Sequence, residues 1–186
     1  MRKLIVFNNV TLNGYFTDAH GDMSWAHQQD PEWREFTASN AGSGGELVFG
    51  RVTYDLMAGF WPTPAALQSM PTVAERMNSL PKIVFSKTMN KATWNNTRLI
   101  KSDIVSATQK LKQEPGDTLV IMGSGSIIAQ LTSAGLIDEY QIVIHPLALG
   151  DGTTMFDGIK QKLHLKVTKT RTFGNGNVFV CYEPKA

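Results

Sequence analysis

The chain has 186 residues, of which 42% are hydrophobic and 18% are charged, and its formal net charge is +2. This length and composition predict one globular domain with a real hydrophobic core and exclude a disordered chain. Lys and Arg are scattered along the sequence, so no basic stripe predicts binding to a nucleic acid.

Cysteine content and the lengths of the apolar runs indicate the compartment. Cys181 is the only cysteine, which excludes an intramolecular disulfide and gives no metal-ligand spacing. The apolar run near the N-terminus, Leu4 to Val10, is too short for a signal-peptide core or a membrane span. We therefore expect a cytoplasmic protein that binds neither a membrane nor a metal.

Short apolar runs in the first half of the sequence predict buried strands. Leu4 to Val10 is rich in Ile and Val, and the Asn13-Gly14 pair after it is typical of a tight turn. Leu47 to Phe49 predicts a second strand, followed by a helix from Thr53 to about Ala58. Ile83 to Phe85 predicts another strand of the same kind.

Capping residues predict three helices between these strands. Asp30, which precedes a proline, predicts the N-cap of the first helix. Thr72 and Glu75 form a capping-box pattern for a second, short helix. Either Ser102 or Asp103 predicts the start of a third.

The pattern changes in the last third of the chain. Leu119 to Met122 predicts one more strand that leads into a helix opened by Gly123 to Ser126. Three later segments predict extended strands: Tyr140 to Ile144, Leu163 to Phe173 and Val178 to Tyr182. The last two flank a glycine-rich hairpin turn. Strand-helix units followed by a hairpin predict an α/β fold with a mixed, mostly parallel sheet, helices on both faces and ligands at the carboxyl ends of the strands.

Three of these junctions place small, hydroxylated or cationic residues just after a buried strand. They are Gly50-Arg51, Ser86-Lys87-Thr88 and Gly123 to Ser126. A helix N-terminus offers unpaired N–H groups and a positive dipole end, and glycine lets a phosphate approach the backbone. Each junction alone is also compatible with an ordinary loop or a solvated surface charge. Together they predict a nucleotide site.

The same segments carry a family resemblance. Leu47 to Tyr54 resembles the Gly-Arg-x-Thr-aromatic segment of the dihydrofolate reductase superfamily, and Ile83 to Lys87 and Met122 to Ser126 resemble its next two cofactor segments in the same order. Asp138 to Phe156 is most similar to the RibD C-terminal domain, the reductase module of riboflavin biosynthesis. The resemblance covers the chain as one domain, 1–186. It implies a dihydrofolate reductase-like three-layer fold, NADPH as hydride donor, a homodimer and a small heterocyclic substrate.

The resemblance also implies the cofactor contacts. Arg51 and Thr53 would hold cofactor phosphates, and Ser86 and Lys87 would meet the 2′-phosphate, which favours NADPH over NADH. The full implied set of cofactor-binding residues is Val10, Gly50, Arg51, Val52, Thr53, Ser86, Lys87, Thr88, Met122, Gly123, Ser124, Gly125, Ser126 and Ile127.

Four residues are candidates for binding the substrate. Thr11 and Asn13 stand where the family has Ser-Leu-Asp-Gly, with Thr for Ser and Asn for Asp. Met23-Ser24-Trp25 resembles the Met-Pro-Trp of dihydrofolate reductases, and Trp61 lies in a proline-rich segment that predicts a loop. Both tryptophans are therefore candidates for stacking in the substrate cleft.

Counting onward from Trp25 places Asp30 where those enzymes have a substrate-binding carboxylate, so Asp30 is the candidate catalytic residue. A buried carboxylate with a raised pKa can help deliver a proton. An N-cap carboxylate instead accepts backbone N–H groups and has a lowered pKa. The sequence leaves proton donor, substrate ligand and helix cap open. His145, alone before Pro146, is interpreted as a structural or surface residue and is not a catalytic candidate.

Two functions remain. The first is an NADPH-dependent oxidoreductase that transfers hydride to a pyrimidine- or pterin-type substrate, such as a ribosylaminopyrimidine phosphate or dihydrofolate. The second is a non-catalytic NADPH- or nucleotide-binding module of the same fold, which the altered Thr11 and Asn13 positions motivate.

Overall fold

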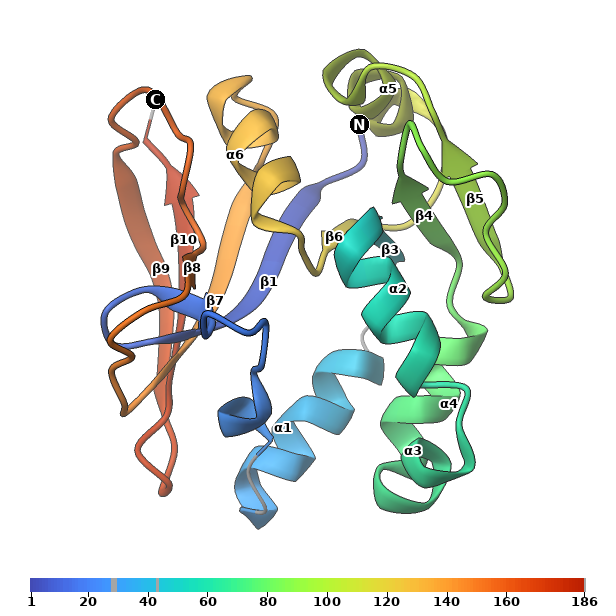
Figure 1. Ribbon diagram of the computed structural model, residues 1–186. Coiled ribbons are helices and arrows are strands. Elements are labelled where there is room, and N and C mark those ends of the chain that lie inside the picture. Colours follow the sequence, from blue (N-terminus) through green and yellow to red (C-terminus); the bar gives the residue numbers. More distant parts are fainter. Residues whose placement is uncertain (28–29, 43, 186) are drawn as a thin grey trace.

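An eight-stranded sheet forms the centre of the computed structural model, which describes residues 1–27, 30–42 and 44–185 (Figure 1). Across the sheet, the strands are β5 (Thr97–Ile100), β4 (Lys82–Phe85), β3 (Glu46–Gly50), β6 (Leu119–Ile121), β1 (Leu4–Thr11), β7 (Glu139–His145), β10 (Val178–Pro184) and β9 (Leu165–Thr172). The six strands from β5 to β7 in this order are parallel to one another, and β10 is antiparallel to its two neighbours, β7 and β9. The predicted mixed sheet with a final hairpin is confirmed. A separate pair is formed by β2 (Tyr15–Thr17) and β8 (Thr153–Thr154).

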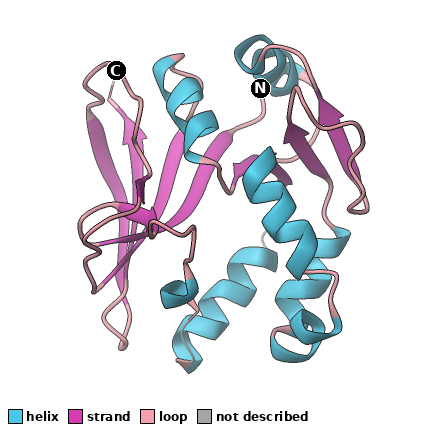
Figure 2. Ribbon diagram, viewed as in Figure 1, coloured by secondary structure: helices cyan, strands magenta, loops and turns pink. Residues whose placement is uncertain are grey.

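Helices cover both faces of the sheet, as Figure 2 shows. One face carries α5 (Ile104–Gln113) and α6 (Gly125–Ser133). The other carries α1 (Pro31–Gly42), α2 (Arg51–Phe60), α3 (Pro64–Ser69) and α4 (Pro71–Ser79), with a short 3-10 turn, η1 (Ser24–Ala26), before α1. The predicted three-layer fold is therefore confirmed. No helix of the described residues is long and apolar enough to cross a membrane.

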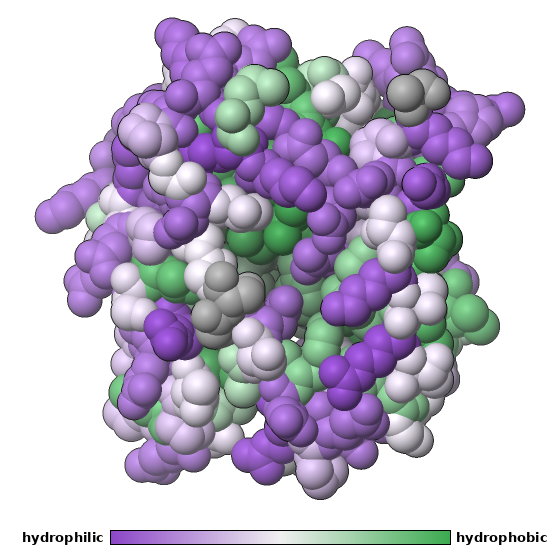
Figure 3. Space-filling model, turned by 180° about the vertical axis from the view of Figure 1, so that it is seen from behind, coloured by the Kyte–Doolittle hydropathy of each residue, from purple (hydrophilic) through white to green (hydrophobic). Residues whose placement is uncertain are grey.

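The central strands are apolar throughout because both of their faces are covered. In β3, Val48 packs into the cluster beneath α5 and α6, whereas Leu47 and Phe49 pack beneath α2 and α4. All three side chains are buried. Seen from behind, the surface is mainly hydrophilic around its outline, and hydrophobic residues gather in a hollow near its centre (Figure 3).

A third, aromatic cluster holds α1 against β7 and the β9–β10 hairpin. Trp33 of α1 packs edge-on against Phe173, with ring centroids 5.3 Å apart. Glu32 joins the same elements, since its carboxylate accepts hydrogen bonds from Arg171 at 2.9 Å and from the backbone N–H of Gly174 at 3.1 Å. These bonds lower the pKa of Glu32. The first turn of α1 is thereby fixed over the end of β7.

Three local predictions need correction. The predicted Thr72 capping box is wrong, because α4 begins at Pro71 after Met70 and has no side-chain cap. The proline-rich segment is partly helical: α3 begins at Pro64, which suits the first helical position, and Thr63 caps it. The edge strand β5 was missed because Thr97–Ile100 mixes polar and apolar residues and is only half-buried.

Asp138 joins three elements, and its loss should destabilise the fold. Its Oδ2 accepts hydrogen bonds from the N–H of Leu4 at 2.7 Å and from the ammonium of Lys112, which is nearly buried. We expect Asp138→Ala to lower the free energy of unfolding by about 2 kcal/mol, because both donors lose a charged acceptor. Asp138→Asn keeps an acceptor for Leu4 and should lose less. Urea denaturation measures both, and an unchanged midpoint for Asp138→Ala would contradict the assignment.

Candidate functional site

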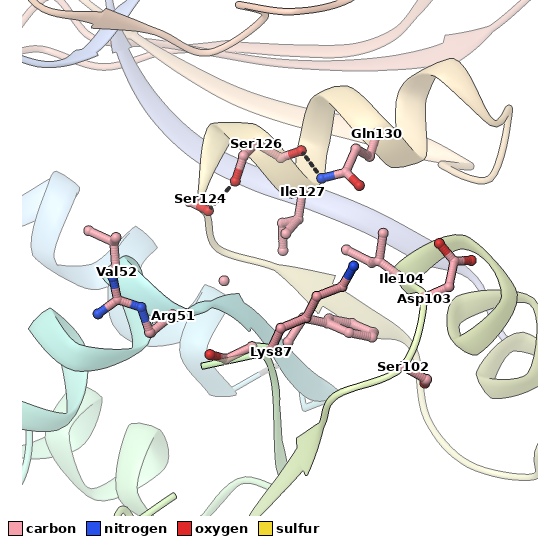
Figure 4. Close-up of a pocket in the computed structure, with 13 residues that line it drawn as sticks. Arg51, Val52, Lys87, Ser102, Asp103, Ile104, Ser124, Ser126, Ile127 and Gln130 are labelled. Atoms are coloured by element: carbon pink, nitrogen blue, oxygen red, sulfur yellow. Dashed lines mark hydrogen bonds between the residues drawn. The ribbon is translucent and has the colours of Figure 1, made fainter. Parts of the chain in front are cut away.

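A pocket of about 320 Å³ opens at the carboxyl ends of the parallel strands (Figure 4). This volume lies at the lower end of the range for ligand pockets, roughly 300–1,000 Å³. Its walls come from the segments that follow four neighbouring strands, β6, β3, β4 and β5. The lining residues are Gly50, Arg51, Val52, Phe85, Ser86, Lys87, Ser102, Asp103, Ile104, Ser124, Ser126, Ile127 and Gln130.

Two helices present uncapped N-termini to this pocket. The N-cap residue of α2 is Gly50 and that of α6 is Ser124, and neither makes a side-chain capping bond. The third helix at the pocket, α5, differs because Asp103 caps it by accepting a hydrogen bond from the N–H of Ser106 at 2.9 Å. Uncapped first-turn N–H groups and the positive dipole ends favour an anion between α2 and α6.

The loops before α2 and α6 touch one another through glycine. The N–H of Gly50 donates to the carbonyl of Gly123 at 3.0 Å, and a Cβ on Gly50 would lie 2.3 Å from the Ser124 hydroxyl oxygen. Gly123 has a φ of +123°, and a Cβ there would lie 2.8 Å from the Thr53 hydroxyl oxygen. The positive φ of Gly123 requires glycine there, and glycine at position 50 leaves the Ser124 hydroxyl in place, so the two helix N-termini come close together.

The charged residues of the pocket differ in where they point. Arg51 lies on the α2 side, where its guanidinium is 3.4 Å from the carboxylate of Asp55 and both side chains are half exposed. Lys87 instead extends across the pocket toward α5 and α6 (Figure 4). The Ser86 hydroxyl accepts a hydrogen bond from the N–H of Met89 at 3.0 Å, which starts the turn after β4.

The pocket brings together much of the predicted cofactor set. The members that line it are Gly50, Arg51, Val52, Ser86, Lys87, Ser124, Ser126 and Ile127. The lining does not include Val10, Thr53, Thr88, Met122, Gly123 or Gly125. Val10 lies in the core at the end of β1, Thr53 packs against Gly123 at the junction of the two loops, and Gly125 packs against Phe16. Asp103 and Ser102 were missed as pocket residues because β5, which precedes them, was not recognised.

A second group of polar side chains lies where β1 and β7 end, beneath the first helix. His145 is fully buried between Trp25 and Trp33, with ring centroids 5.1 and 5.7 Å away. Its Nε2 lies 3.0 Å from the side-chain oxygen of Asn9, and burial lowers its pKa to about 4. Among the described residues, His145 Nδ1, Trp25 Nε1 and the buried amide of Asn177 make no hydrogen bond.

Thr11 and Asn13 are engaged in holding the chain together. The Thr11 hydroxyl donates to the side-chain oxygen of Asn13 at 2.8 Å and accepts from the N–H of Tyr15 at 3.0 Å. The Asn13 amide donates to the carbonyl of Leu149 at 2.7 Å and accepts from its N–H at 3.2 Å. The pair therefore ties the β1–β2 turn to the loop after β7.

The remaining predicted site residues occupy different environments. Asp30 caps α1 by accepting a hydrogen bond from the N–H of Trp33 at 2.8 Å, so the capping interpretation is confirmed. Trp25 is half-buried in η1 beside His145. Trp61 packs in the core with Phe49 and Tyr54, and its Nε1 lies 3.0 Å from the sulfur of Met57. This burial leaves Trp61 without an exposed ring face for stacking.

Comparison with known proteins identifies the family. The family model for the RibD C-terminal domain matches residues 2–179. The chain belongs to the RibD C-terminal domain family. It is 31% identical over 181 residues to the uncharacterized protein YyaP of Bacillus subtilis, with 97% of this chain and 94% of YyaP covered.

Solved structures share the fold. A putative riboflavin biosynthesis protein from Shewanella sp. PV-4 matches with a TM-score of 0.76 and 24% identity, covering 99% of both chains. Dihydrofolate reductase from Enterococcus faecalis, solved with NADP(H), matches with a TM-score of 0.67 and 16% identity over 99% of this chain and 97% of that one. Membership of the RibD C-terminal domain family and the dihydrofolate reductase-like fold together support the interpretation of this chain as a reductase.

Burial of neutral His145 should make stability depend on pH. Its folded pKa, about 4, lies below the ordinary value of 6.5, so the unfolded state binds the proton first. Above pH 6.5 the histidine is neutral in both states and costs no stability. As the pH falls from 6.5 toward 4, only the unfolded state is protonated, so the free energy of unfolding declines. We expect the free energy of unfolding to drop by roughly 2 kcal/mol more in the wild type than in His145→Gln between pH 7 and 4.5. Urea denaturation at both pH values measures this, and equal declines would contradict it.

Proposed function

We propose that this chain binds NADPH in the pocket formed by α2, α5 and α6 and reduces a small heterocycle of the pyrimidine or pterin type. The two uncapped helix N-termini that meet at Gly50 and Ser124 carry this proposal. Their N–H groups and dipoles suit a pyrophosphate, and Lys87 adds a positive charge in the same pocket. The shared fold of an NADP(H)-bound dihydrofolate reductase supports the choice of cofactor.

The order of the strands supports one orientation for the dinucleotide. With the pyrophosphate between α2 and α6, the adenosine half extends along the pocket past β4 to β5, where Lys87 and Ser102 lie. The nicotinamide half then extends the opposite way, toward the carboxyl end of β1. Trp25, Asp30 and the buried His145 group belong to that side, so we place the heterocycle there.

The bound cofactor would supply a hydride, and the chain would hold the acceptor against it. We assign stacking or edge contact with the heterocycle to Trp25, and a hydrogen bond to a ring nitrogen to Asp30. The carboxylate of Asp30 is half-buried and uses one oxygen in capping α1. The same side chain can therefore fix the helix and meet the substrate. Thr11 and Asn13 would act by holding the β1–β2 turn in place.

A non-catalytic nucleotide-binding module is the second candidate, and the engagement of Thr11 and Asn13 in loop contacts favours it. Both functions predict NADPH binding, which is measured by titrating the fluorescence of the protein. Only the enzyme consumes NADPH when an aminopyrimidine or dihydropterin acceptor is added. Asp30→Asn should abolish that turnover with NADPH binding unchanged; binding without turnover for any such acceptor would select the module.

Glycine at position 50 should favour cofactor binding. We expect Gly50→Ala to raise the Kd for NADPH several-fold, because its Cβ would push the Ser124 hydroxyl aside and would lie 3.3 Å from the backbone N of Ser124, where the pyrophosphate is proposed to bind. Gly59→Ala is the matched control in the same helix, since a Cβ there meets nothing within 4 Å. Fluorescence titration measures both variants, with thermal unfolding as the check on folding. Equal affinity in the two variants would overturn the proposed cofactor site.

We also propose a cytoplasmic homodimer, with an exposed apolar stripe on α2 as its contact. Val52 and Leu56 are each 59% exposed, and Phe60 is 38% exposed. Val52, Leu56 and Phe60 are spaced four residues apart and so share one side of α2. We expect a dimer by light scattering and a shift toward monomer in Leu56→Glu. Unchanged mass in that variant would exclude this stripe as the interface.

A further inference from the structure

The pocket runs along the carboxyl ends of four neighbouring strands, and its two ends are lined by different kinds of residue. The residues after β6 and β3 supply the uncapped helix N-termini, and the residues after β4 and β5 supply Lys87, Ser102 and Asp103. Neighbouring strands lie about 4.8 Å apart, so β5 is roughly 10 Å from β3. A nucleoside attached to a pyrophosphate at β3 and β6 therefore has its ribose near β4 and β5. This step rests on the proposed function.

This ribose end of the pocket contains charges of both signs. Lys87 takes part in none of the ion pairs formed by the described residues. Asp103 is the only carboxylate among the residues that line the pocket. Its side chain is exposed and held in place at the N-terminus of α5 by the hydrogen bond from the Ser106 N–H. That bond and the charge of Lys87 lower the pKa of Asp103, so the carboxylate is ionised at neutral pH.

We propose that Asp103 sets the preference of this chain between the 2′-phosphorylated dinucleotide and its unphosphorylated form. Lys87 attracts a phosphate on the ribose, and Asp103 repels it. The same carboxylate can accept hydrogen bonds from a ribose that carries free 2′ and 3′ hydroxyls. Selectivity for NADPH over NADH is therefore lower than Lys87 alone would produce.

The test removes this charge and keeps the helix cap. Asn and Ser are also favourable N-cap residues, so Asp103→Asn and Asp103→Ser retain an acceptor for the Ser106 N–H. Glu75→Gln, on the exposed side of α4 and outside the pocket lining, changes the net charge equally and serves as the control. The Kd values for NADPH and NADH are measured by fluorescence titration at low and high salt for all four proteins. Thermal unfolding reports whether each variant is folded.

We expect the ratio of the NADH Kd to the NADPH Kd to rise about three- to tenfold in both Asp103 variants. A carboxylate and a phosphate that share a partly solvated pocket repel each other by about this factor, and the repulsion should shrink at high salt. The control should leave the ratio unchanged. An unchanged or lower ratio in the Asp103 variants, with the wild type binding nucleotide, would overturn the role of Asp103. A wild type that binds neither nucleotide would instead overturn the proposed function.

Discussion

The close contact between the loops after β3 and β6 is the constraint on which the rest of the site depends. A Cβ on Gly50 would lie 2.3 Å from the Ser124 hydroxyl oxygen, so that hydroxyl would have to rotate away from its position at the junction. This contact brings the N-termini of α2 and α6 to one point, and the parallel sheet fixes where that point lies. The two helices pack on opposite faces, so their dipoles meet only at the sheet edge. An anion placed there is attracted by both helices, although each dipole contributes only about 0.3–1 kcal/mol.

Three of the charged residues near the proposed ligand sites also take part in a structural interaction, whereas Lys87 forms no ion pair with the described residues. Asp30 caps α1, Arg51 lies beside Asp55, and Asp103 caps α5. A capping carboxylate is fixed in space but keeps its negative charge, so it can still interact with a ligand that binds beside it. The exposed pair of Arg51 and Asp55 is different, because such pairs are worth roughly 0–1 kcal/mol and a phosphate can compete for the guanidinium. Capping therefore fixes the positions of the Asp30 and Asp103 carboxylates, whereas the exposed ion pair leaves the Arg51 guanidinium available to bind a phosphate.

The sequence predicts most of the sheet because the central strands are buried on both faces and appear as continuous apolar runs, such as Leu47 to Phe49. It fails at the β5 edge of the sheet, where Thr97–Ile100 is half-buried and polar residues interrupt the run. The consequence for the site is direct, since Ser102 and Asp103 follow that strand and join the pocket only through pairing with β4. Trp61 shows the reverse limit: a proline-rich segment indicates a loop, but tertiary packing with Tyr54 and Phe49 decides that its ring is buried.

His145 shows how a residue with no local signal gains a defined environment from the fold. Its neighbours Asn9, Trp25 and Trp33 come from β1, η1 and α1, and the parallel register of β1 with β7 brings the first of these to it. With the Asn9 oxygen as acceptor, the proton of the neutral ring lies on Nε2, which makes Nδ1 an acceptor. A buried acceptor close to the Trp25 indole is a polar feature at the end of the sheet where we place the heterocycle. Recognition there would combine the Asp30 carboxylate with hydrogen bonds from neutral groups, whereas binding in the nucleotide pocket would depend mainly on positive charge and helix dipoles.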